Sequence, residues 1–267
     1  MAHTSRSAAS ARSAFRSCLL KSIHAPGPLD VPKLPEETAV IPYRSGPYTL
    51  TGYLDGAGDT SDARCPAILY SHGGCGLSDE HFASAERFVD AGFVVFSPTY
   101  RGEHHNPGYY ELFLGEVDDA RAALTRLAAF PQVDASRIYA FGYSMGGEIA
   151  ALLSLFDDLP LRCTGSCGPF FLRSEPFSEE SMYGAPVPFD VSDERETHFR
   201  LLRSHLGGLA LPHTAFVGRE DEKFLDGTWR YVRTDGTLLS IIEVDGTHDS
   251  SLAHAIDAFL EIIHSDR

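Results

Sequence analysis

Two kinds of pattern alternate along most of this chain. Mostly apolar runs, such as 67–71 and 137–143, predict strands that are buried on both faces of a sheet. Stretches such as 80–91 and 114–130 instead place apolar residues at the spacing of one helix face. The same alternation continues with strands predicted at 93–97, 164–168, 214–218 and 238–244, and with helices at 146–155 and 250–263. Strands and helices in alternation predict an α/β fold in which helices cover both faces of a mostly parallel sheet.

Two regions depart from this alternation. Residues 40–54 alternate unevenly and predict edge strands joined in a hairpin. From residue 170 to residue 212, Pro, Phe and acidic residues mix around one helical stretch at 194–206. We interpret 170–212 as a small cap inserted over one edge of the sheet, with a plain long connection as the alternative. The domain itself is expected to span residues 37–267.

Residues 1–36 are expected to form a separate N-terminal arm. Its first 29 residues contain Arg, Ser and Ala but no acidic residue, and Pro residues mark the linker that follows. Acid-poor ends rich in Ser and Arg are typical of organelle transit peptides, whereas the alternative is an arm that packs on the domain. We therefore expect a cytoplasmic protein, with an organelle as the alternative if residues 1–29 act as a transit peptide.

The composition limits the partners. Acidic residues outnumber basic ones, 37 to 22, which gives a formal net charge of -15 and disfavours a nucleic-acid partner. An anionic substrate would need a local basic pocket, and the sequence shows no basic cluster. A long apolar run at 138–156 is interrupted by three glycines and Glu148. Since a spanning helix needs about 20 apolar residues with few breaks, we expect no membrane span.

Metals and cofactors are not expected. The five cysteines are odd in number and scattered, so we predict reduced thiols rather than a disulfide framework. Cys163 and Cys167 have loose metal-ligand spacing, but no second Cys or His pair accompanies them. His104 and His105 are adjacent on an extended segment, where successive side chains point in opposite directions. We therefore predict no metal site and no cofactor.

The segment Gly142-Tyr-Ser144-Met-Gly146 matches the pattern G-x-S-x-G. A predicted strand precedes the segment and a predicted helix follows it, which is the setting of a nucleophile elbow. A sharp turn from strand to helix brings neighbouring backbone close, so glycine is needed two positions before and after the serine. Ser144 is therefore the candidate nucleophile, at a helix N-terminus that favours developing negative charge. The alternative is a serine that merely caps the helix.

A second motif, His72-Gly-Gly74-Cys75-Gly, follows directly on the predicted strand at 67–71. Loops of this kind direct backbone N–H groups at the carbonyl oxygen of a substrate under attack. We predict that the N–H of Gly74 or Cys75, together with that of Met145, forms an oxyanion hole. His72 is interpreted as a structural hydrogen-bonding residue, because its position offers no third group to orient it as a base. Cys75 is expected to line the pocket, since nothing evident would lower the pKa of its thiol.

A serine nucleophile needs a base and an orienting carboxylate, which follow an elbow of this kind in the order acid, then histidine. His248 lies in a loop directly after the predicted strand at 238–244, where residues face the carboxyl edge of a parallel sheet. Asp221 lies in the acidic loop after the strand at 214–218 and is the candidate acid. The alternatives are a helix-capping role for His248 and, for the acid, the neighbours Glu220, Glu222 and Asp226.

Together with Tyr100-Arg101-Gly102, these segments resemble the prolyl-oligopeptidase and dienelactone-hydrolase-like branch of the α/β-hydrolase superfamily. The similarity covers roughly residues 45–265 and implies an α/β-hydrolase fold with a sheet of about eight strands. It also implies a Ser-His-Asp triad that hydrolyses a small-molecule ester or amide without a cofactor. Two departures are evident. This sequence holds no β-propeller like the one that gates prolyl oligopeptidases, and Ser144 stands where dienelactone hydrolases use cysteine.

The sequence therefore predicts a carboxylesterase-like serine hydrolase, with peptidase or amidase activity as the main variant. A non-catalytic protein that binds a ligand or partner through the same pocket is the alternative from another class, and an acyltransferase or lyase on the same triad also stays open. The resemblance implies that Arg101 forms an ion pair supporting neighbouring loops, with the binding of a substrate carboxylate as the alternative. Negative charge suits the dipole at the start of the helix predicted at 114–130, which contains Glu116, Asp118 and Asp119.

Overall fold

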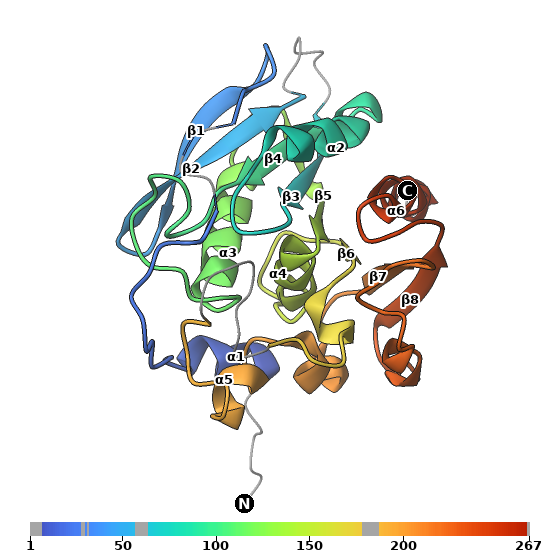
Figure 1. The fold of residues 1–267 in the computed structure, drawn as a ribbon. Helices are drawn as coiled ribbons and strands as arrows, with labels where there is room; N and C mark the ends of the chain where they lie inside the picture. Colours follow the sequence, from blue (N-terminus) through green and yellow to red (C-terminus); the bar gives the residue numbers. More distant parts are fainter. Residues whose placement is uncertain (1–6, 28–29, 31, 57–63, 178–186, 266–267) are drawn as a thin grey trace, which may run out of the picture.

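An eight-stranded sheet forms the centre of the computed structural model, which describes residues 7–27, 30, 32–56, 64–177 and 187–265 (Figure 1). The strands are β1 (Ala39–Ser45), β2 (Tyr48–Asp55), β3 (Cys65–Ser71), β4 (Val94–Pro98), β5 (Val133–Tyr143), β6 (Thr164–Cys167), β7 (His213–Gly218) and β8 (Leu239–Val244). Their order in the sheet is β1-β2-β4-β3-β5-β6-β7-β8. The hairpin of β1 and β2 is antiparallel, as is the pairing of β2 with β4, and the remaining pairings are parallel. The predicted mostly parallel sheet is therefore confirmed.

Helices cover both faces of the sheet. They are α1 (Ala8–Ala14), α2 (Asp79–Asp90), α3 (Gly115–Ala128), α4 (Met145–Leu153), α5 (Glu194–His198) and α6 (Ser251–Ser265), with 3₁₀ turns η1 (Phe170–Leu172), η2 (Leu202–Gly208) and η3 (Thr228–Tyr231). α2 and α6 bury Phe88 and Phe259 in one apolar core, whereas α3 and α4 bury Leu124 and Ile149 in the other. Among the described residues, no helix combines the length and the apolar character needed to cross a membrane.

The helix predicted at 194–206 is shorter than expected. α5 ends at His198, and the chain becomes extended at Leu201 before η2 begins. The amide of Leu202 explains the break, because it donates to the carboxylate of Glu148 on α4 at 2.8 Å instead of to a carbonyl one helical turn earlier. The prediction of one continuous helix was therefore wrong, since a tertiary hydrogen bond overrides the local pattern.

The start of the N-terminal arm packs against the region expected to form the cap, of which residues 178–186 lie outside the described residues. Figure 1 shows α1 beside α5. Arg12 is 2% exposed, and its guanidinium donates to the backbone carbonyls of Phe113, Leu114 and Phe199. The ring of Phe15 stacks on that of Phe199, with centroids 4.6 Å apart. This part of the arm thus belongs to the folded body.

Arg101 and Asp119 form a buried ion pair. Nη2 of Arg101 lies 2.8 Å from Oδ1 of Asp119, and both the backbone N–H and Nε of Arg101 donate to Oδ2 at 2.9 Å. Ser45, at the end of β1, donates its hydroxyl to the same carboxylate at 2.6 Å. The side chain of Asp119 is 0% exposed, so its charge requires a partner. The ion pair expected for Arg101 is confirmed, and it ties β1, the loop after β4 and α3 together.

The helix dipole does not account for two of the three acids at the start of α3. Asp119 is engaged in the ion pair, and the buried side chain of Glu116 accepts the N–H groups of Glu111 and Leu112 at 2.7 and 3.2 Å. Of the three, Asp118 has the exposed side chain. The dipole interpretation was therefore insufficient for Glu116 and Asp119. Their partners lie outside the helix, and a helical pattern in the sequence does not identify such partners.

Removing the charge of Asp119 should destabilise the fold far more than removing that of its neighbour Asp118. Asp119→Asn leaves the largely buried Arg101 without its main partner, so we expect the free energy of unfolding to fall by about 3 kcal/mol. Asp118→Asn breaks a contact with Arg121 near the surface and should cost at most about 0.5 kcal/mol. Urea denaturation followed by circular dichroism measures both values. Equal losses in the two variants would contradict a structural role for the buried pair.

Candidate active site

Ser144 stands at a sharp turn between β5 and α4. Its backbone has φ 51° and ψ -109°, a strained conformation for a residue with a side chain. A Cβ atom on Gly142 would lie 2.0 Å from the carbonyl oxygen of Gly146, and one on Gly146 would lie 2.1 Å from that of Ser71. Close packing therefore requires glycine at both positions, as the spacing of the motif indicates.

The hydroxyl of Ser144 lies at one end of a chain of hydrogen bonds. Its Oγ is 3.1 Å from Nε2 of His248, and Nδ1 of His248 is 2.7 Å from Oδ2 of Asp221. The three residues are buried, with 2%, 8% and 1% of their surfaces exposed in the order serine, histidine, aspartate. The structure thus brings into contact the three residues that the sequence analysis selects as nucleophile, base and acid.

Asp221, rather than the acids around it, faces the imidazole of His248. The three neighbouring acids are exposed, namely Glu220, Glu222 and Asp226. Space for the ring depends on Gly168, where an added Cβ would lie 2.7 Å from Cε1 of His248. A carboxylate at Nδ1 holds the tautomer in which Nε2 is free to accept a proton, so this arrangement can activate the serine hydroxyl.

Two histidines hold the ends of the predicted oxyanion loop. The N–H of Gly73 donates to Nε2 of His81 at 3.1 Å, and that of Leu77 donates to Nε2 of His104 at 3.2 Å. Burial lowers the pKa of His81 to about 3, so the ring stays neutral and can accept. These two amides are already paired with side chains from α2 and from the loop after β4, which leaves the residues between them as candidate donors.

Cys75 lies beside the first residue of α4. Its Sγ is 3.5 Å from Sδ of Met145, and a Cβ placed on Gly74 would meet no heavy atom within 4 Å beyond its chain neighbours. Burial raises the pKa of the Cys75 thiol to about 12, so this side chain stays protonated and is a poor nucleophile. Cys75 therefore lies next to Met145 at the elbow, and the role of these amides as oxyanion donors stays a prediction.

His72 has the third group that the sequence did not reveal. Its Nε2 is 3.1 Å from Oε2 of Glu103, and its Nδ1 is 3.1 Å from the carbonyl oxygen of Gly73. Burial alone would lower the pKa of His72, but the carboxylate of Glu103 outweighs that effect and raises it. The expectation that nothing orients this ring was wrong, because Glu103, directly after the Tyr100-Arg101-Gly102 segment, reaches it from the loop after β4. Within the described part of the chain, no cluster of His, Cys, Asp and Glu is arranged to hold a metal ion.

Arg173 is a site residue that the sequence analysis missed. Its Nη2 donates to Oγ of Ser144 at 3.3 Å, and its guanidinium lies 3.7 Å from the centre of the Phe170 ring. The sequence shows no basic cluster, and Arg173 follows η1 in an irregular stretch without a motif or a helical period. The turn η1 is what directs this guanidinium to the nucleophile, so the tertiary fold was needed to find it.

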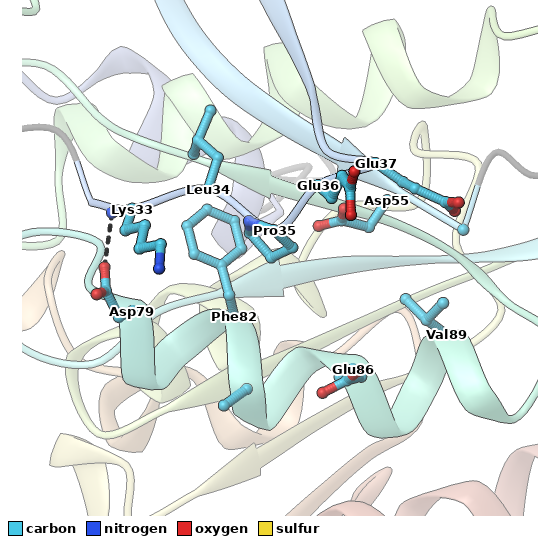
Figure 2. A pocket seen from close by; sticks show the side chains of 12 residues that line it. Lys33, Leu34, Pro35, Glu36, Glu37, Asp55, Asp79, Phe82, Glu86 and Val89 are labelled. Atoms are coloured by element: carbon cyan, nitrogen blue, oxygen red, sulfur yellow. Dashed lines mark hydrogen bonds between the residues drawn. The ribbon is translucent and has the colours of Figure 1, made fainter.

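Two cavities differ in their relation to this site. One of about 410 Å³ adjoins Arg173, with Leu172, Arg203 and Thr228 among its walls. Another of about 810 Å³ lies between residues 33–37 and α2, as Figure 2 shows, and contains none of the three triad residues. Its walls combine acidic with apolar side chains, namely Glu36, Glu37, Asp55, Asp79 and Glu86 with Leu34, Phe82 and Val89. The smaller cavity is likewise lined by none of the three triad residues, and Arg173 links it to the nucleophile.

Sequence comparison leads to the same group of proteins as the motifs. The profile of the Dienelactone hydrolase family matches residues 51–159, a segment that includes Ser144 and the oxyanion loop but neither Asp221 nor His248. A protein of Bacillus subtilis (strain 168) named Uncharacterized peptidase YtmA is 36% identical over 69 residues. That alignment covers 26% of this chain and 27% of the Bacillus protein, so the similarity spans about a quarter of each.

Structural comparison identifies the fold. The acylaminoacyl peptidase of Pyrococcus horikoshii matches 85% of this chain and 40% of its own, with a TM-score of 0.66 at 16% identity. The hyperthermophilic esterase of the archaeon Pyrobaculum calidifontis matches 86% of this chain and 85% of its own, with a TM-score of 0.64 at 19% identity. This chain therefore has the α/β-hydrolase fold, and its resemblance to the dienelactone-hydrolase and prolyl-oligopeptidase branch is confirmed.

The contact between His248 and Asp221 should control the reactivity of Ser144. Asp221→Asn keeps the shape of the side chain but removes its charge and disturbs the tautomer, so labelling by a fluorophosphonate probe should slow by about 10³–10⁴-fold. Glu222→Gln, which changes the exposed acid next to it, should leave the rate unchanged. A labelling time course read on a fluorescent gel compares the two variants. Equal rates in both would contradict the assignment of Asp221.

Proposed function

We propose that this protein is a serine hydrolase that cleaves a carboxylic ester or amide of a small molecule through an acyl-enzyme intermediate. The observation that carries the proposal is the chain of hydrogen bonds that joins Ser144 to His248 and His248 to Asp221. The α/β-hydrolase fold and the peptidase and esterase names of similar proteins support it. A serine that only capped a helix would need neither a strained backbone nor a buried imidazole at its hydroxyl.

In the first half-reaction, Nε2 of His248 accepts the hydroxyl proton while Oγ of Ser144 attacks the acyl carbonyl carbon. Asp221 keeps the proton on Nδ1 and stabilises the imidazolium that forms. The N–H of Met145 and an N–H of the oxyanion loop take up the negative charge on the carbonyl oxygen. The bond to the leaving group then breaks as His248 returns its proton to that group, which leaves Ser144 acylated.

The second half-reaction releases the acid. His248 accepts a proton from a water molecule while the water oxygen attacks the acyl carbon. The same amides stabilise the second tetrahedral intermediate, and His248 gives the proton back to Oγ of Ser144 as the ester bond to the enzyme breaks. Together the two halves add one water across the substrate bond and restore the resting site.

Within this class we propose carboxylesterase activity, with peptidase or amidase activity as the main variant. Similar proteins carry both kinds of name, since the Bacillus subtilis protein is named a peptidase and the Pyrobaculum calidifontis structure an esterase. A p-nitrophenyl ester and a p-nitroanilide of the same acyl group separate the two activities, because only the leaving group differs. Turnover in the presence of an added alcohol separates hydrolysis from acyl transfer.

Replacing the nucleophile tests the proposal. Ser144→Ala should lower the turnover of short and long p-nitrophenyl esters by at least about 10³-fold, because the oxyanion hole and substrate binding remain while the attacking group is lost. Ser154→Ala is the matched control, since it removes another buried hydroxyl at the end of the same helix. That variant should keep most of the wild-type turnover. A wild-type protein that turns over neither esters nor amides would replace the proposal with the non-catalytic alternative.

A further inference from the structure

Glu148 is a fully buried carboxylate on the helix that begins at the nucleophile. It lies one turn after Ser144 on α4, and 0% of its surface is exposed. Its Oε2 accepts the N–H of Phe171 at 2.6 Å, and its Oε1 accepts the N–H of Leu202 at 2.8 Å. A buried carboxylate is costly unless both oxygens are satisfied, and here both partners belong to the region after β6. One side chain therefore fastens two separate segments to the nucleophile helix.

The first of these segments leads back to the nucleophile. The turn η1 is followed by Arg173, whose guanidinium lies over the ring of Phe170 and donates to Oγ of Ser144. Arg203 holds the opposite side of this turn, since its guanidinium donates to the carbonyl oxygens of Phe171, at 2.8 Å, and of Arg173. The turn is thus fixed at an N–H by a carboxylate and at two carbonyls by a guanidinium. The backbone that carries Arg173 is thereby held between α4 and Arg203.

We infer that Glu148 is a positioning residue of the active site, which holds Arg173 against the Ser144 hydroxyl without touching the substrate itself. The inference rests on the proposed hydrolase function and deepens it by adding a residue outside the triad and the oxyanion hole. Positioning affects the rate strongly, because a displacement of about 1 Å near the reacting groups can cost about 10²-fold. Loss of the Glu148 contact would free η1 and move the guanidinium away from Oγ.

Glu116 offers a matched comparison within the same fold. It is another buried glutamate that accepts two backbone N–H groups, and burial raises the pKa of both Glu116 and Glu148 to about 7. The loop that Glu116 holds contacts Arg101 and Arg200 through Glu111, so it leads to the ion-pair region of the fold. Glu116 accepts both N–H groups at Oε1, so Glu116→Gln removes a buried carboxylate and can keep both contacts. Glu148 uses one oxygen for each N–H, so Glu148→Gln leaves one of the two without an acceptor.

Protonation of Glu148 should weaken the contact. Burial raises the pKa of this carboxyl, against the lowering effect of its two N–H bonds and of Arg203 and Arg173. His213 packs behind Phe171, with ring centroids 5.9 Å apart, and burial lowers its pKa to about 3, so it adds no charge. A protonated carboxyl accepts fewer hydrogen bonds than a carboxylate, so one N–H bond is lost below about pH 7. Activity should therefore fall on acidification through this group as well as through the catalytic base.

Glu148→Gln and Glu116→Gln, made in the full chain, test the inference with a p-nitrophenyl ester. Glu148→Gln should lower kcat by about 10- to 100-fold with KM changed by less than about threefold, whereas Glu116→Gln should keep kcat within about threefold. On acidification, log kcat/KM should fall by about one to two units more in the wild type and in Glu116→Gln than in Glu148→Gln, because protonation of Glu148 weakens the same contact that the substitution removes. A merely structural role would lower thermal stability in both variants and leave the three pH profiles parallel.

Hydrogen exchange of the peptide covering residues 168–175 supplies a readout that needs no turnover. Exchange should be faster in Glu148→Gln than in the wild type and unchanged in Glu116→Gln. If Glu148→Gln does not fold, Arg203→Met replaces it, since that exposed side chain holds the other side of the turn. It should show a lower kcat together with faster exchange. Wild-type exchange would overturn the inference even if kcat falls, because Arg203 also lines the cavity beside Arg173.

The outcomes separate the inference from the proposed function. If the wild type is active, two results overturn the positioning role. One is an equal loss of kcat in Glu148→Gln and Glu116→Gln, and the other is a wild-type kcat in Glu148→Gln. An inactive wild type rejects the hydrolase function. In that case, faster exchange confined to Glu148→Gln supports the contact that holds η1, and equal exchange in both variants rejects it.

Discussion

The sharp turn at Ser144 is the constraint on which the rest of the structure depends. The backbone at Gly142 and Gly146 is packed so closely that β5 and α4 meet with no side chain between them. This contact forces Ser144 into a positive φ and presents its hydroxyl at the carboxyl edge of the sheet. Groups that reach the hydroxyl must come from loops at that edge, and the parallel order of β5 to β8 brings the loops holding His248 and Asp221 there.

Buried carboxylates hold the loops that surround this turn. Asp119 joins the hairpin to α3 through Ser45 and holds the loop after β4 through Arg101. Glu103 orients His72 beside the oxyanion loop, and Glu148 fastens the turn before Arg173. Each links segments that are distant in the sequence. In a poorly solvated interior such contacts are strong when complete and costly when one partner is lost, so each of them constrains the position of a loop. The net charge of -15 gives no hint of this arrangement, because it counts charges without placing them.

The sequence was sufficient to predict those elements and candidate residues that depend on a local pattern of residues. Apolar runs and helical periods predict the strands and most helices, short motifs select Ser144 and the oxyanion loop, and a loop position after a strand selects His248. Asp221 could be chosen only by its position after a strand, and its exposed neighbours could not be excluded until burial was known. The errors share one cause, since the break after α5, the burial of Asp119 and the contact of Arg173 with Ser144 all depend on partners from distant segments. No local pattern encodes such a partner.

The most direct test of the account is the mass of the intact protein, quenched in acid during turnover of p-nitrophenyl trimethylacetate. The bulky acyl group of this ester slows deacylation, so the acyl-enzyme should accumulate. We expect a mass increase equal to that acyl group, located by peptide mapping on Ser144. Release of p-nitrophenol without any adduct, or an adduct on Cys75 or another residue, would contradict it.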